Sequence, residues 1–144
     1  MTIREIIESV NTYAKSNLSQ AQKIECLSQL DMHIYEEVIL PHEGKQAFMQ
    51  PHADGTYSPR LFPYTSDSAE LIAPPRFKKM YELYLKCEAD YRENEAAKYA
   101  EDITLFQSLY EQFCAWYHRN HLSAQSIGIR TAPTYQRRTE YAAK

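Results

Sequence analysis

The stretch that decides the fold is residues 74–121, PPRFKKMYELYLKCEADYRENEAAKYAEDITLFQSLYEQFCAWYHRNH. Its apolar and aromatic residues recur at steps of three or four, or at multiples of these, which is typical of one apolar stripe along a helix. The stripe consists of Phe77, Tyr81, Tyr84, Tyr91, Tyr99, Ile103, Phe106, Tyr110, Phe113 and Tyr117. We therefore expect helical structure that is buried along one side.

The most polar window of this stretch is residues 92–95, and its Asn94 suits a tight turn between helices. Pro74 and Pro75 mark the start, because proline is tolerated in the first turn of a helix. We predict two antiparallel helices, 75–92 and 96–120, because one long helix would leave much of its apolar face uncovered. A continuous helix remains an alternative, since no glycine or proline interrupts the window.

Two further helices are predicted upstream of this stretch. Thr2 with Glu5, and Ser19 with Gln22, have the spacing of a capping box, in which two side chains satisfy the free amides at a helix start. Apolar residues follow each pair at helical steps. We expect the first helix over 3–15 and the second over 20–39, ending before Pro41.

Length and composition indicate one all-α domain. A chain of 144 residues can build a single core. Only three glycines are present, and the content of Ala, Glu, Gln, Lys and Leu favours helices. We expect about four helices in a bundle within residues 1–121, followed by a separate arm over 122–144.

Residues 41–73 form a connection far longer than most loops, and loops of this length are usually either functional or disordered. Its apolar residues are too many for a solvated linker. They are Phe48, Met49, Tyr57, Leu61, Phe62, Tyr64, Leu71 and Ile72. We expect an ordered loop, with a short hairpin around residues 53–56.

The arm is basic and the rest of the chain is acidic. Residues 122–144 carry a net charge of +3, so a total of −3 leaves −6 for residues 1–121. This asymmetry indicates a partner with an acidic surface; a terminus whose charge only aids solubility is the alternative.

Catalytic signatures are absent from the sequence. His118 and His121 can share a helix face, but no Glu or Asp stands three residues before any histidine, as a di-metal helical bundle requires. We favour a role in which the two histidines lie at the end of the helix and face its backbone carbonyls. The alternative is that the chain is a metal-dependent enzyme that uses these histidines with a carboxylate of the second helix. Asp31 lies near apolar residues of the second helix, so we expect it to be partly buried and satisfied by an Arg or a Tyr hydroxyl. We expect no enzymatic activity, cofactor or metal.

The three cysteines and the hydropathy indicate the compartment. Cys26, Cys87 and Cys114 are widely spaced, which is typical of buried thiols in a reducing environment. No run of 18 apolar residues and no signal-peptide pattern occurs, so we expect a soluble protein made in the cytoplasm, without a membrane partner.

Five segments occur together in a recognisable order: 30–38 (LDMHIYEEV), 63–67 (PYTSD), 71–75 (LIAPP), 80–85 (MYELYL) and 116–121 (WYHRNH). As a collinear set they resemble the small head–tail connector proteins, also called adaptor or head-completion proteins, of long-tailed bacteriophages and prophages of Gram-positive bacteria. The resemblance spans about residues 1–122 and carries no single specific motif.

The resemblance implies a helical structural protein of the virion neck, assembled in the host cytoplasm. Such proteins form a ring, typically of twelve subunits, beneath the portal protein. The ring extends the DNA channel, through which DNA passes without sequence-specific binding, and it docks the stopper or tail-completion protein. Another neck component, such as a stopper, is one alternative; a small helical DNA-binding regulatory protein is the other.

Aromatic side chains are the candidates for contacts with neighbours, because tyrosine suits surfaces that are half inside a subunit and half against another. The alternative is that they lie at the edge of a small core. The candidates are Phe48, Tyr57, Phe62, Tyr64, Tyr84, Tyr91, Tyr99, Tyr110, Trp116 and Tyr117. The candidates for docking the arm to the portal are Arg130, Tyr135, Arg137, Arg138 and Tyr141.

Overall fold

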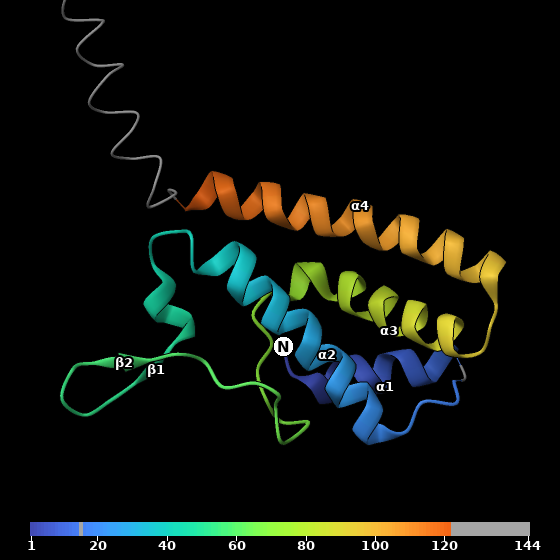
Figure 1. Ribbon diagram of the computed structural model, residues 1–144, viewed down its shortest axis with the longest axis horizontal. Helices are drawn as coiled ribbons and strands as arrows, with labels where there is room; N and C mark the ends of the chain where they lie inside the picture. Colours follow the sequence, from blue (N-terminus) through green and yellow to red (C-terminus); the bar gives the residue numbers. More distant parts are fainter. Residues whose placement is uncertain (15, 122–144) are drawn as a thin grey trace, which may run out of the picture.

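Four α-helices dominate the computed structural model, which describes residues 1–14 and 16–121 (Figure 1). They are α1 (Ile3–Tyr13), α2 (Gln20–Ile34), α3 (Lys78–Arg92) and α4 (Ala96–Asn120). A π-helical turn, Tyr35–Ile39, prolongs α2, and a 3-10 turn, Pro75–Phe77, precedes α3. The predicted all-α class and the bounds 20–39, 75–92 and 96–120 are confirmed.

Helices α3 and α4 form an antiparallel hairpin, so the alternative of one continuous helix is wrong. Asn94 adopts a left-handed conformation with φ of 58°, which asparagine tolerates better than most residues. The turn is closed by bonds from the Glu93 amide to the Ala89 carbonyl and from the Glu95 amide to the Asp90 carbonyl, each 3.0 Å long. The polar window 92–95 therefore ends one helix and starts the next.

The predicted capping box is complete at the start of α2, whereas only its Thr2 half is formed at the start of α1. The Ser19 hydroxyl accepts from the Gln22 amide at 3.2 Å, while the Gln22 side chain accepts from the Ser19 amide at 2.8 Å. At α1, the Thr2 hydroxyl accepts from the Glu5 amide at 3.3 Å. Helix α1 ends at Tyr13 rather than at 15, because Ala14 already has an extended backbone conformation.

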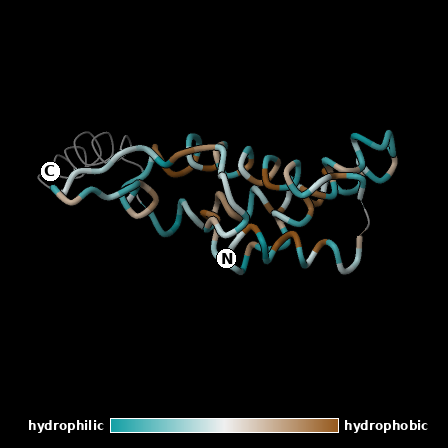
Figure 2. Tube along the Cα trace, turned by 90° about the horizontal axis from the view of Figure 1, so that it is seen from below, coloured by the Kyte–Doolittle hydropathy of each residue, from teal (hydrophilic) through white to brown (hydrophobic). Residues whose placement is uncertain are grey.

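Helix α3 lies in the middle of the bundle and contacts each of the other three helices, with α4 on one side and α1 and α2 on the other (Figure 1). The apolar residues concentrate where the helices face one another, whereas the chain is mostly pale or teal along the β1–β2 hairpin (Figure 2). Tyr81 and Tyr117 are the two largest fully buried side chains, followed by Phe113. Among the described helices, none is long and apolar enough to cross a membrane.

The long connection 41–73 is ordered, as predicted. It contains a 3-10 turn, Lys45–Phe48, and a short hairpin in which β1 (Gln50–Pro51) pairs antiparallel with β2 (Tyr57–Ser58). The hairpin tip is residues 53–56, and Gly55 supplies the positive φ of 85° that the turn needs. Farther along, the segment returns to the bundle, where Arg4 pairs with Asp67 at 2.8 Å.

Asp31 joins this segment to the core. Its carboxylate accepts from the hydroxyls of Tyr81 at 2.5 Å and Tyr64 at 2.6 Å, and from the Ile72 amide at 3.0 Å. Asp31 is fully buried, and burial raises the pKa of its carboxyl, although these hydrogen bonds act in the opposite direction. Of the two expected partners, an Arg or a Tyr hydroxyl, the structure shows tyrosine hydroxyls, and the burial of Asp31 is complete rather than partial.

Candidate assembly surfaces

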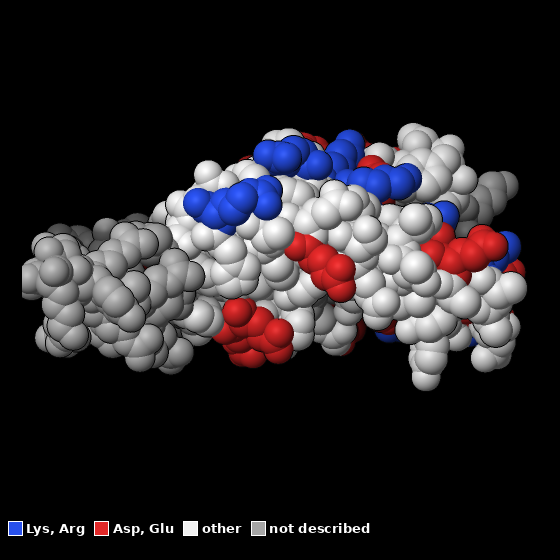
Figure 3. Space-filling view, turned by 90° about the horizontal axis from the view of Figure 1, so that it is seen from above, with Lys and Arg blue, Asp and Glu red and all other residues white. Residues whose placement is uncertain are grey.

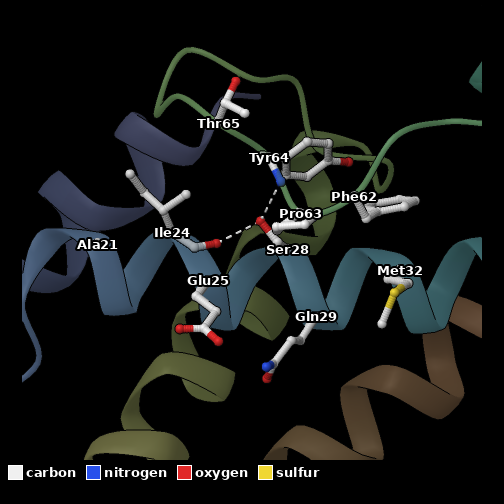
Figure 4. A pocket seen from close by; sticks show the side chains of 10 residues that line it. All are labelled: Ala21, Ile24, Glu25, Ser28, Gln29, Met32, Phe62, Pro63, Tyr64 and Thr65. Atoms are coloured by element: carbon white, nitrogen blue, oxygen red, sulfur yellow. Dashed lines mark hydrogen bonds between the residues drawn. The ribbon is translucent and has the colours of Figure 1, made fainter.

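A shallow apolar groove lies between the outer face of α2 and the loop segment 62–65 (Figure 4). Its volume is about 510 Å³. The lining side chains come from these two elements: Ala21, Ile24, Glu25, Ser28, Gln29, Met32, Phe62, Pro63, Tyr64 and Thr65. Glu25 is the only one of these that is charged at neutral pH. The groove is therefore suited to an apolar side chain of a partner rather than to an ionic ligand.

The loop wall of the groove is held to α2 by a short chain of hydrogen bonds. The Tyr64 amide donates to the Ser28 hydroxyl at 3.0 Å, and that hydroxyl donates to the Ile24 carbonyl at 2.8 Å (Figure 4). The Arg60 Nε donates to the Tyr64 hydroxyl at 2.8 Å. Together with the bond to Asp31, these contacts fix the wall before any partner arrives, which lowers the entropy cost of binding.

The exposed side of α4 forms a second, different surface. From Ile103 to Tyr117 the helix carries a single acidic or basic residue, Glu111. Leu105 is 55% exposed on this side. Figure 3 looks onto the α4 side of the molecule and shows scattered charged groups separated by wide uncharged areas. Depletion of charge is characteristic of the centre of a protein interface.

The predicted contact aromatics divide into exposed and packed residues. Tyr91 is 70% exposed at the hairpin end of α3, and Tyr57 is 49% exposed on β2. Tyr99 is half-buried beside Tyr91, with ring centroids 5.8 Å apart. Phe62 and Tyr64 line the groove. These five side chains present at least part of their surface to solvent.

The other five candidates contribute mainly to the subunit's own packing. Tyr117 is only 2% exposed, so it is a core residue and offers no surface to a partner. Phe48, Tyr84, Tyr110 and Trp116 are half-buried against the core. Their rings pack against the buried apolar residues of the bundle.

The two histidines near the end of α4 have different partners. His121 Nδ1 lies 3.1 Å from the Tyr117 carbonyl, in agreement with the expected contact to a helix-terminal carbonyl. His118 Nδ1 instead lies 2.8 Å from Nε2 of the buried His42, whose Nδ1 contacts the Val38 carbonyl. Within residues 1–14 and 16–121, no group of three or more His, Cys, Asp or Glu side chains could hold a metal ion. The contact between His118 and His42 therefore connects α4 to the segment after α2.

Three surface residues were not among the sequence-based candidates: Ile24 and Met32 of the groove, and Leu105 of α4. Met32 and Leu105 fall outside the apolar stripes of their helices. An apolar residue that is out of phase with the stripe of its helix is the sequence signal that could have identified them as surface residues. The candidates Arg130, Tyr135, Arg137, Arg138 and Tyr141 lie outside the described residues.

Comparisons of the chain with protein-family models, with curated proteins and with solved structures found no match.

Proposed function

We propose that this chain is a non-enzymatic head–tail connector protein, an adaptor whose copies form a ring beneath the portal protein. The observation that supports this most is the presence of two unlike, charge-poor surfaces on one subunit. One is the groove on α2, and the other is the α4 face that carries Leu105. The collinear resemblance of the five sequence segments supports the same function.

Two unlike surfaces suit a closed ring. In a heterologous contact, one face of each subunit meets a different face of the next, and such contacts close into a ring when the rotation allows it. The α4 face supplies a projecting apolar side chain, Leu105, and the groove supplies an apolar recess of about 510 Å³. In our proposal, each Leu105 enters the groove of the neighbouring copy, in a ring of twelve subunits as in the proteins that the chain resembles.

The charge of the chain is compatible with a ring around DNA. A strongly basic channel would bind phosphates and slow the genome, whereas residues 1–121 carry a net charge of −6. The ring would extend the channel of the portal and dock the stopper or tail-completion protein in the virion neck. Such a protein needs no cofactor and no membrane.

Sedimentation velocity of the chain with purified portal protein tests this function. We expect the chain to co-sediment with the portal as a multimer. The Leu105→Asp variant should remain a monomer or bind with much lower occupancy, because a carboxylate would be buried in the apolar groove. A native chain that stays monomeric and unbound across protein concentration and salt would contradict the proposal.

A further inference from the structure

Two histidines from distant parts of the chain meet near the end of α4. His42 follows the π-helical turn after α2, and its side chain is buried, at 3% exposure. His118 lies in the last turn of α4 and is exposed. Nδ1 of His118 is 2.8 Å from Nε2 of His42, where the two segments lie side by side (Figure 1). The pair is therefore a direct link between the end of α4 and the segment after α2.

The contacts of His42 determine which ring nitrogens carry protons. Nδ1 of His42 is 2.5 Å from the Val38 carbonyl oxygen, which can only accept a hydrogen bond, so this Nδ1 carries a proton. In the neutral ring the other nitrogen, Nε2, is then an acceptor. Nδ1 of His118 must therefore donate to it. Nε2 of His118 takes no part in the link.

The link tolerates one additional proton but not two. The first proton can bind Nε2 of the exposed His118, and the charged ring still donates from Nδ1, in a stronger hydrogen bond. A second proton can bind only Nε2 of His42, and there it removes the acceptor of the link. Two donors and two positive charges would then face each other at 2.8 Å, which is strongly unfavourable.

The aromatic neighbours of the pair stay neutral or add to this effect. The Tyr117 ring lies edge-on to His42, with ring centroids 5.2 Å apart, and burial raises its pKa, so Tyr117 is neutral in acid. His121 stacks on the other side chain of this group, Tyr117, at 3.9 Å. A proton on His121 would bring a further positive charge toward the pair.

The charged side chains on the elements around the pair are of both signs. Glu37 faces α4 near Tyr110 and Cys114, and it pairs with His33 at 3.3 Å. The others are exposed: Glu36, Glu43, Lys45, Arg76 and Arg119. Within residues 1–14 and 16–121, no ion pair joins a carboxylate to His42 or His118. A second positive charge at the pair is therefore not offset by a described carboxylate in contact with it.

We propose that the His42–His118 pair is a pH-sensitive link, which holds the end of α4 to the segment after α2 at neutral pH and releases it when both rings are protonated. In the range where imidazoles titrate, about pH 6.5 and below, the linked chain binds fewer protons than the released chain. The link therefore becomes more stable as the pH rises. It does not depend on the adaptor function.

Nitrogen-15 NMR of the histidine rings in the full chain tests the protonation scheme. At pH 7.5 we expect a proton on Nδ1 of both rings and a scalar coupling across the hydrogen bond from His118 Nδ1 to His42 Nε2. The coupling should be lost by about pH 5, below the ordinary titration range of imidazole. A proton on Nε2 of His42 at pH 7.5, no coupling at that pH, or an unchanged coupling at pH 4.5 would overturn the proposal.

Fluorescence of Trp116, the only tryptophan of the chain, follows the release itself. We expect the emission of the native chain to change over the same pH range, while circular dichroism shows that most of the helix remains. His118→Ala removes the donor, so at pH 7.5 it should have the emission of the native chain at pH 5. His118→Asn retains an amide donor and should have the native emission at pH 7.5.

His52→Ala is the matched control, because His52 is an exposed histidine in the connection between β1 and β2. This variant should keep the native pH profile. His121 is present in His118→Ala, so a change caused by His121 would persist in that variant. A native pH profile in His118→Ala, loss of the change in His52→Ala, or loss of most of the helical signal over the same pH range would overturn the proposal.

Discussion

The hydroxyl of Tyr64 donates to the fully buried carboxylate of Asp31 across 2.6 Å, and thereby ties the wall of the surface groove to the centre of the bundle. The same carboxylate accepts from Tyr81 on α3. One acidic side chain of α2 therefore positions both the long connection and the central helix. Changes at this carboxylate should affect the groove and the core together.

The Tyr81→Phe variant should unfold more easily than the native chain. The substitution leaves one oxygen of the buried Asp31 without its 2.5 Å donor and removes the acceptor of the Ala73 amide. Loss of a hydrogen bond to a buried charged group costs about 1.5–3 kcal/mol. Urea denaturation gives the free energy of unfolding. Tyr57→Phe, at a half-exposed ring, is the matched control and should change it by less than about 0.5 kcal/mol; equal effects of both variants would contradict the role of Asp31.

The stability that Asp31 contributes should depend on pH. Burial raises the pKa of this carboxyl in the folded chain above its ordinary value of 3.8, so the native state holds the proton more tightly than the unfolded state. The contribution of Asp31 to the free energy of unfolding is full below pH 3.8 and is lost as the pH rises through the pKa that the carboxyl has in the folded chain. The free energy of unfolding of the native chain, relative to the Asp31→Asn variant, should therefore fall between pH 4 and neutral pH. A difference that is constant or that grows with pH would contradict this sign.

The cysteines should differ in their reactivity. Burial raises the pKa of Cys26 to about 11 and that of Cys87 to about 12, and both side chains are buried. Cys114 is half-buried, so it should react first with a disulfide reagent at pH 8. Cys26 and Cys87 should react only at the rate of unfolding. The Cys114→Ser variant should have no thiol that reacts rapidly with the disulfide reagent. A rapid phase of thiol modification that persists in this variant would show that the core opens without global unfolding.

A single charge on the α4 face should prevent assembly without affecting folding. Leu105 is 55% exposed, so Leu105→Asp should leave the unfolding midpoint nearly unchanged while the oligomer in the presence of portal is lost. Thr12→Asp, at an exposed position of α1, adds the same charge on a different side of the subunit and should assemble normally. Loss of assembly in both variants would indicate a general effect of charge.

Helical periodicity allowed most of the fold to be predicted from the sequence. The stripe at steps of three and four, the two capping patterns and Asn94 were sufficient for the bounds of α2, α3 and α4 and for the α3–α4 turn, because each is encoded within a few residues. The end of α1 was predicted two residues too late. The placement of the 41–73 segment could not be predicted from the sequence, because it depends on contacts between distant residues, such as Asp31 with Tyr64 and Arg4 with Asp67.

The candidate surfaces were predicted less well than the fold. Aromatic type alone does not distinguish Tyr117, which is buried, from Tyr91, which is exposed, because exposure depends on which side of α4 or α3 meets a neighbour. The groove is formed by α2 together with a loop about forty residues later in the chain. Such a surface exists only after folding, and no local pattern marks both of its walls.

Disulfide cross-linking between subunits tests the proposed heterologous contact most directly. Met32→Cys places a thiol in the groove and Leu105→Cys places one on the α4 face, each in a Cys114→Ser background and with portal present. We predict that oxidation of a mixture of the two variants yields cross-linked dimers, that neither variant alone does so, and that one chain carrying both thiols yields a ladder of multimers. Cross-links within a single-thiol variant, or none in the mixture while the chains are bound to portal, would contradict the proposed ring contact.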